Sequence, residues 1–144
     1  MLSQLLLAAA IVLSAAEAPQ PRTGVPFRVI THSSNTVVSL TRAELSAIFM
    51  RRTRSWRDGA EARPVEPSTE RLREQFSRAI HGKSIAYVTR YWQRVIFSGR
   101  GVPPEALPSD AAVIEFVKTH RGAIGYINGA TPPGDGVKLL AVTP

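Results

Sequence analysis

The stretch Leu40–Gly59, LTRAELSAIFMRRTRSWRDG, constrains the fold more than any other part of the chain. Thr41 and Glu44 have the spacing of a capping box, in which each side chain accepts a hydrogen bond from the other residue's backbone N–H. Leu40 and Leu45 flank this cap at the spacing of a hydrophobic staple. Helical periodicity then places three apolar side chains on one face: Leu45, Ile48, Phe49. The sequence therefore predicts a short helix that begins after Thr41 and packs on a hydrophobic core.

The composition predicts one globular domain. A chain of 144 residues with 44% hydrophobic and 20% charged residues is long enough to bury a core, but short for two domains. Because cysteine is absent, disulfides, thiol chemistry and thiolate metal sites are excluded.

The N-terminus has the features of a secretory signal peptide, predicted as residues 1–16. The apolar run Leu5–Leu13 is followed by small residues and is shorter than the roughly 20 residues that span a bilayer. Cleavage after Ala16 is expected, with cleavage after Ala18 as the alternative. Because no Lys or Arg precedes the run, an uncleaved anchor or a misassigned start codon is the other interpretation. We therefore expect a periplasmic or secreted protein, with residues 17–26 as an extended tether and 27–144 as the folded domain.

The charge is strongly basic, with a net value of +7 and 15 arginines among the 18 cationic residues. Such a balance suits an anionic partner, namely phosphate, nucleic acid or an anionic membrane. Export argues against nucleic acid. The alternative is that these arginines lie on solvated faces and bind nothing.

Periodicity and turn residues predict the order β-α-β-α-α-α-β-β, a small mixed sheet with about four helices. In the second strand, Pro64 predicts an edge position, because proline cannot donate to a sheet ladder. The expected strands are Phe27–Thr31, Ala62–Glu66, Ala123–Ile127 and Val137–Val142. The expected helices are 42–50, 70–80 and two more that begin at Ser84 and Ser109. The third helix should bury Ile85, Val88, Trp92, Val95 and Ile96.

Three segments, in the same order, resemble the phosphate-binding proteins of bacterial ABC transporters, in the periplasmic-binding-protein superfamily. Leu40–Gly59 is similar to the family's leucine–threonine helix, which leads into a tryptophan–x–aspartate–glycine turn. Phe76 is similar to the aromatic residue in the helix after the family's anion loop. Gly122–Ile127, GAIGYI, resembles the family's glycine–x–isoleucine–glycine–tyrosine strand. The resemblance runs from about Val29 to the C-terminus.

The resemblance implies an α/β fold of one periplasmic-binding-protein lobe, the second of the two lobes that close on phosphate in full-length relatives. The family's arginine–x–aspartate–x–serine–glycine–threonine loop is not intact. Alignment on Phe76 places Glu66 at its arginine and Glu70–Leu72 at its serine–glycine–threonine. Carboxylates repel an anion by about 1 kcal/mol at 4 Å even in water. The family's phosphate ligands are therefore not transferred to these positions.

The start of the second helix is the first candidate anion site. Free N–H groups and the helix dipole favour an anion at a helix N-terminus. Ser68 and Thr69 supply hydroxyls there, and Arg71 supplies charge. The alternative interpretation is that Ser68 or Thr69 only caps the helix.

The loop after the first strand, His32–Thr36, is the second candidate. Ligands often bind where strands of open α/β sheets end, and Ser33, Ser34 and Asn35 could contact an oxyanion. The alternative is an ordinary polar turn, since serine and asparagine are common turn residues.

Other chemistry-bearing residues receive structural interpretations. The arginines around Trp56 suit phosphate or carboxylate, with a solvated loop as the alternative and Trp56 in the core. The three histidines lack metal-ligand spacing, and Ser33 or Ser34 beside His32 lacks an acid partner and a nucleophile elbow. Tyr126 is expected as a sheet residue at a lobe surface. We predict no enzyme, no metal site and no cofactor.

Two functional hypotheses follow. In the first, an exported lobe of phosphate-transport type weakly binds a small oxyanion such as phosphate. In the second, the lobe has lost ligand binding and is an accessory module for a periplasmic or membrane protein partner. Whether the Ser68–Arg71 helix start and the His32–Thr36 loop meet in one concave site distinguishes them. The oligomeric state stays open.

Overall fold

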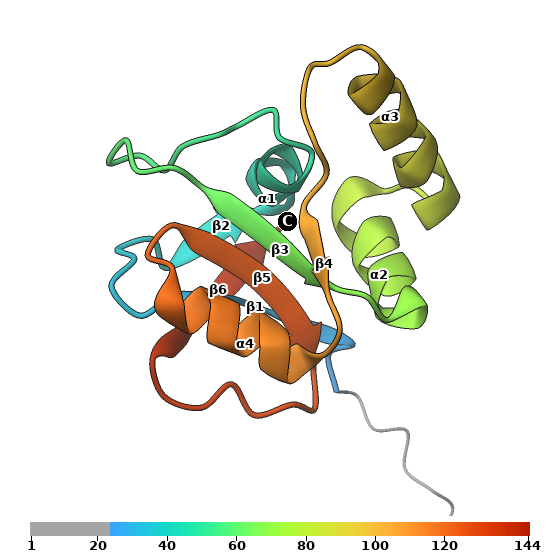
Figure 1. Cartoon of the computed structure of the whole chain (residues 1–144). Helices are drawn as coiled ribbons and strands as arrows, with labels where there is room; N and C mark the ends of the chain where they lie inside the picture. Colours follow the sequence, from blue (N-terminus) through green and yellow to red (C-terminus); the bar gives the residue numbers. More distant parts are fainter. Residues whose placement is uncertain (1–23) are drawn as a thin grey trace, which may run out of the picture.

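The computed structural model describes residues 24–144, so the predicted signal peptide and most of the tether lie outside the described residues. A six-stranded mixed sheet in the order β2-β6-β1-β5-β3-β4 forms the centre, with helices on both faces (Figure 1). The strands are β1 (Phe27–His32), β2 (Ser39–Thr41), β3 (Arg63–Pro67), β4 (Glu105–Leu107), β5 (Ala123–Asn128) and β6 (Val137–Thr143). The helices are α1 (Arg42–Phe49), α2 (Glu70–Phe76), the π-helix η1 (Ser77–His81), α3 (Ile85–Phe97) and α4 (Asp110–Thr119). The predicted mixed α/β class is confirmed.

Two hydrophobic clusters lie on opposite faces of the sheet. Neighbouring residues of a strand point to opposite faces, so Val29 belongs to one cluster and Ile30 to the other. On the first face, α1, α2 and η1 cover the sheet; on the second, α4 does (Figure 1). The helix α3 lies at the margin and packs through Val88 and Trp92 on Met50.

The first helix forms as its capping pattern predicts. The Glu44 N–H donates to Thr41 Oγ1 at 3.1 Å, and the Thr41 N–H donates to Glu44 Oε2 at 2.8 Å. The bond from the Thr41 N–H, together with one from the Thr41 hydroxyl to Glu44 Oε2, lowers the pKa of the Glu44 carboxyl. The predicted apolar face is buried in the first cluster: Leu45, Ile48, Phe49.

The GAIGYI segment forms the buried central strand β5. Trp56 is 7% exposed, as predicted for a core residue, and its Nε1 donates to the Gly122 carbonyl at 3.0 Å. A β-carbon at Gly122 would lie 1.9 Å from the carbonyl oxygen of Glu61. Glycine is therefore required at this position by close backbone approach.

The prediction that Pro64 lies in an edge strand is wrong, because β3 lies between β5 and β4. The proline is tolerated because β4 pairs only with Val65–Pro67, one residue further on. The short strands β2 and β4 were not predicted, since three residues show too little periodicity.

Two helix predictions also need correction. The second helix changes to π-helical geometry at Ser77. Gly82, with φ of 65°, then ends it as expected. In α3, Ile96 is 50% exposed, so it does not belong to the buried face.

The Gly122 contact predicts that Gly122→Ala destabilises the fold by about 2 kcal/mol, because the added methyl group must displace the Glu61 backbone. Chemical denaturation measures this change. Gly24→Ala is the matched control, since beyond its chain neighbours no atom of residues 24–144 lies within 4 Å of a β-carbon there. Equal stability of the two variants would contradict the prediction.

Candidate functional site

The first candidate anion site lies at the corner where β3 ends and α2 begins. Thr69 is the N-cap, but its side chain makes no capping hydrogen bond, unlike those of the other α-helix caps: Thr41, Ser84, Ser109. The Ser68 N–H is already used, donating to the Leu107 carbonyl at 2.8 Å. Ser68, Thr69 and Arg71 are all exposed. The helix start is thus open to solvent on its outer side.

A buried carboxylate lies directly behind this corner. Glu66 Oε1 lies 2.9 Å from Arg73 Nη2, and the Tyr126 hydroxyl donates to Glu66 Oε2 at 3.2 Å. Burial raises the pKa of the Glu66 carboxyl, with Arg73 opposing the rise. Burial and the nearby Glu66 raise the pKa of Tyr126, so its phenol stays protonated. Tyr126 is fully buried, which corrects its predicted place at a lobe surface.

The arrangement of charges at this corner does not favour an anion. A cavity of about 510 Å³ here is lined by Ser68, Glu70, Arg73 and Arg90, together with Ile85, Ala86, Thr89 and Gln93. Glu66 pairs with one of its two arginines, and Glu70 adds a second carboxylate. An incoming oxyanion must compete with Glu66 for Arg73 and approach Glu70. The carboxylates of Glu66 and Glu70, which the sequence predicted to oppose anion binding, thus both lie at this corner.

The second candidate, the loop after β1, is held by local hydrogen bonds. Ser34 Oγ lies 2.7 Å from His32 Nδ1, and the Val37 N–H donates to Asn35 Oδ1 at 2.9 Å. Lys138 Nζ donates to the Asn35 carbonyl, and the Ser33 N–H donates to the Gly136 carbonyl at 3.3 Å. These contacts are those of a polar turn fastened to β6.

The two candidate sites lie at opposite ends of the sheet. Thr31 pairs with Ile124, and Ile124 also pairs with Pro64, so the loop after β1 lies at the N-terminal end of β3. Ser68 follows the C-terminal end of β3 and lies five residues beyond Arg63, or about 17 Å along the strand at 3.3 Å per residue. The structure therefore does not bring Ser33, Ser34 and Asn35 together with Ser68 and its neighbours.

The arginine cluster between α1 and β3 is mainly structural. Arg51 has φ of 58° and donates from Nη1 to the Ala62 carbonyl at 3.1 Å. Arg54 donates to the Arg100 carbonyl at 3.0 Å, and Arg57 lies 3.3 Å from Glu44. These contacts hold the loop that leads Trp56 into the core.

The histidines likewise have structural surroundings. His81 Nδ1 lies 2.7 Å from Ser46 Oγ; burial, and then the charge of Arg52, lower the pKa of His81 to about 4. His120 stacks on Phe116 at 3.9 Å. Within residues 24–144, no group of three His, Asp or Glu side chains is arranged to hold a metal ion. In the same residues, no helix is long and apolar enough to cross a membrane.

A surface that the sequence reasoning missed lies at the C-terminal end of α3. Phe97 is 91% exposed, Val102 67% and Ile96 50%. We call these three residues the α3 tip. The segment from Gln75 to Pro104 contains no aspartate or glutamate, a signal that was visible in the sequence. The same segment contains five cationic residues: Arg78, Lys83, Arg90, Arg94, Arg100.

The architecture is that of one lobe of a periplasmic-binding-protein-like α/β fold, as predicted. Solved structures with this fold include a receptor for ABC-type phosphate transport from Vibrio cholerae, at TM-score 0.60 and 16% identity. Another, from Clostridium perfringens, is described as a phosphate ABC transporter substrate-binding protein and holds phosphate; it gives TM-score 0.61 and 19% identity. PstS of Borrelia burgdorferi gives TM-score 0.53 and 15% identity.

The matches cover 81–82% of this chain, but only 44%, 46% and 47% of the three neighbours. The chain therefore spans less than half the length of these neighbours, as expected for a single lobe. No protein-family model and no curated protein matches the sequence.

The lowered pKa of His81 predicts acid destabilisation. The contribution of neutral, buried His81 is present above about pH 6.5, its ordinary pKa, and is lost as the pH falls toward about 4. The loss should reach about 2–3 kcal/mol. Chemical denaturation should show a lower free energy of unfolding at pH 4.5 than at pH 7.5, and His81→Gln should reduce this drop by about 2 kcal/mol. Thr36→Ala, an exposed position whose side chain does not titrate, should leave the drop unchanged; an equal drop in all three proteins would contradict the assignment.

Proposed function

We propose that this chain is an exported accessory domain of phosphate-binding-protein type that binds a partner protein rather than enclosing phosphate. Two features of the corner support this choice: Glu66 pairs with Arg73, and the second candidate loop lies at the other end of the sheet. Ligand pockets normally bury most of a ligand, and the one lobe formed by the described residues corresponds to one wall of a two-lobe site.

The exposure of the α3 tip is the observation that carries the proposal. A contacting aromatic residue commonly buries 150–250 Å² at an interface, and Phe97 is almost fully exposed. Exposed Arg90, Arg94 and Arg100 lie on the same helix and just after it. Apolar anchors beside arginines are typical of protein interfaces. We infer a partner whose apolar pocket is bordered by carboxylates.

A photo-reactive amino acid at position 97 tests this function in cells that export the protein. We expect one discrete adduct with a periplasmic or membrane protein, lost when Arg94→Glu is added, because the charge reversal repels the partner's carboxylates. The same amino acid at position 111, an exposed alanine of α4, is the control. Adducts that are diffuse, or that persist with Arg94→Glu, would contradict the interface.

Weak oxyanion binding at the β3–α2 corner is the second candidate function. It is favoured by two features within residues 24–144: α2 has no side-chain cap, and Arg73 Nε is buried without a hydrogen-bond partner. If it holds, Glu66→Gln should strengthen binding, because one of the two carboxylates is neutralised.

Calorimetry with phosphate, sulfate and acetate separates the two functions. On the accessory-domain proposal, folded protein shows no heat at millimolar anion, in wild type and in Glu66→Gln alike. Saturable heat that increases in Glu66→Gln, with Ser34→Ala as an unaffected control, would instead establish the oxyanion site. Circular dichroism shows that each variant is folded.

A further inference from the structure

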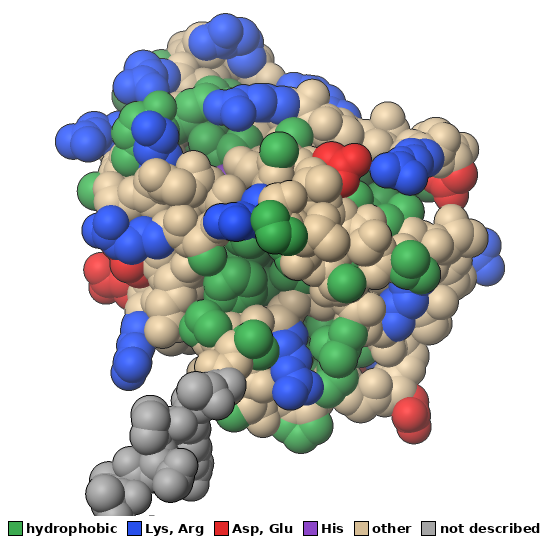
Figure 2. All heavy atoms as spheres, turned by 180° about the vertical axis from the view of Figure 1, so that it is seen from behind, with side chains coloured by type: hydrophobic (Ala, Val, Ile, Leu, Met, Phe, Trp, Pro, Cys, Tyr) green, Lys and Arg blue, Asp and Glu red, His purple; other side chains and the backbone are tan. Residues whose placement is uncertain are grey.

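A groove opens where β1 and β6 separate. The two strands pair from Val29↔Leu140 to His32↔Val137. Beyond Leu140, β6 pairs with β2 instead, at Ala141–Thr143, so the start of β1 at Phe27 and Arg28 is not paired with it. Figure 2 shows the result as a hollow with hydrophobic atoms at its floor and Lys and Arg side chains around it.

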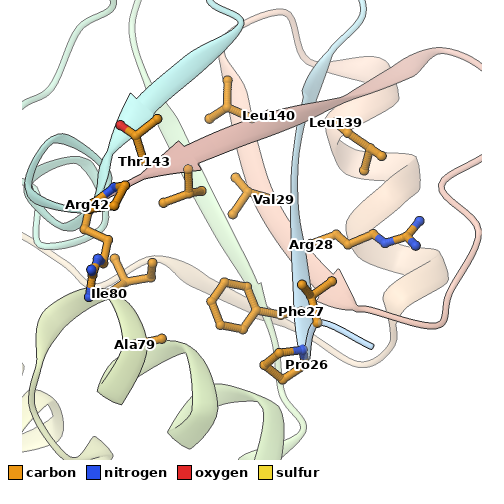
Figure 3. Close-up of a pocket in the computed structure, with 13 residues that line it drawn as sticks. Pro26, Phe27, Arg28, Val29, Arg42, Ala79, Ile80, Leu139, Leu140 and Thr143 are labelled. Atoms are coloured by element: carbon orange, nitrogen blue, oxygen red, sulfur yellow. The ribbon is translucent and has the colours of Figure 1, made fainter. Parts of the chain in front are cut away.

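The walls of this groove are mainly apolar. Its volume is about 680 Å³, and its floor includes the buried side chains of Val29, Ile80 and Leu140. Figure 3 shows Phe27 and Ile80 on opposite sides of the groove, with Val29 and Leu140 beside them. The size lies in the range of small-molecule sites, about 300–1,000 Å³.

A second, basic cavity continues the groove past the start of α1 and the end of η1; we call it the basic extension. This second cavity, of about 540 Å³, shares Arg42, Ala79, Ile80 and Pro144 with the apolar groove. It adds two further guanidinium groups, Arg52 and Arg78, together with the Ser46 hydroxyl. Among the described residues, no aspartate or glutamate lines either part.

The positive charge of the extension persists after its neighbours are counted. Arg78 forms an ion pair with Glu74 on its outer side, and His81 is neutral near pH 7 because its pKa is lowered to about 4. A carboxylate at Pro144, which lines both parts, would offset one further charge. Arg42 and Arg52 carry two positive charges against the single negative charge of that carboxylate, so the site keeps a net positive charge.

We propose that this groove binds a single-chain amphiphile with an anionic head. The chain lies between Phe27 and Ile80, where burial of apolar surface stabilises it, and the head lies on Arg42 at the junction of the two parts. The separation of an apolar half from a basic half matches one molecule with an apolar and an anionic end. The site shares no residue with the α3 tip or the β3–α2 corner, so it is independent of the proposed function.

The probe is dodecyl phosphate below its micelle concentration, followed by calorimetry and by backbone amide NMR of the full exported chain. We expect saturable binding with one molecule per chain and shifts at Phe27, Val29, Ala79 and Ile80. Dodecyl maltoside tests the chain alone and should bind about tenfold more weakly, since it lacks a charge-assisted contact. Inorganic phosphate tests the head alone and should produce no shifts at these residues.

Two pairs of variants test the position of the ligand. Arg42→Gln should weaken dodecyl phosphate binding about tenfold and leave dodecyl maltoside unchanged, whereas Arg121→Gln, on an exposed turn elsewhere, changes neither. Ala79 is exposed and lines the groove, so the indole of Ala79→Trp should fill the groove and abolish binding of dodecyl phosphate and dodecyl maltoside. Ala111→Trp, at an exposed position on α4, should leave the binding of both ligands unchanged. Melting temperatures establish that all four variants are folded.

Several outcomes overturn the proposal. These are equal affinity for dodecyl maltoside and dodecyl phosphate, unchanged affinity in Ala79→Trp, or shifts confined to another surface. Sedimentation that shows a concentration-dependent dimer, dissociated by Ala79→Trp in the absence of amphiphile, would assign the groove to a second copy of the chain instead.

Discussion

The stack of Tyr126 on Phe76 connects the central strand to the helix layer, and much of the molecule depends on it. The rings are parallel, with centroids 3.9 Å apart, and Phe49 and Phe27 pack around them. A buried tyrosine hydroxyl needs a partner, and here Glu66 accepts its hydrogen bond. Glu66 in turn needs a cation, which Arg73 supplies. The charge pattern of the β3–α2 corner thus follows from the packing of the core.

This chain of contacts supports the proposal that the lobe does not enclose phosphate. The strand β3 leads through the corner into α2, whose N-cap Thr69 makes no side-chain capping hydrogen bond with any described residue. The side chain behind it is a carboxylate whose proton affinity is raised by burial. The groove has a different origin. The strand β6 pairs with β1 up to Leu140 and with β2 from Ala141 on, which leaves the start of β1 without β6 as a neighbour.

Sequence reasoning predicted the elements whose signals are local. The capping box at Thr41, the burial of Trp56 and the strand expected at Ala123–Ile127 are all confirmed. Predictions from the sequence were wrong where a residue's position or burial depends on neighbours distant in the chain. Pro64 is tolerated in an interior strand only because β4 pairs one residue later. Ile96 has the periodicity of a buried residue but finds no element to cover it.

The sequence by itself determined the class of fold, because caps, periodicity and glycine positions act within a few residues. It also showed two acidic residues, Glu66 and Glu70, just before the second helix. Only the tertiary structure decided that the two predicted polar sites lie at opposite ends of the sheet, since strand register sets that distance. It also decided which apolar side chains stay exposed at the α3 tip and which line the groove, because burial depends on packing between elements far apart in the chain.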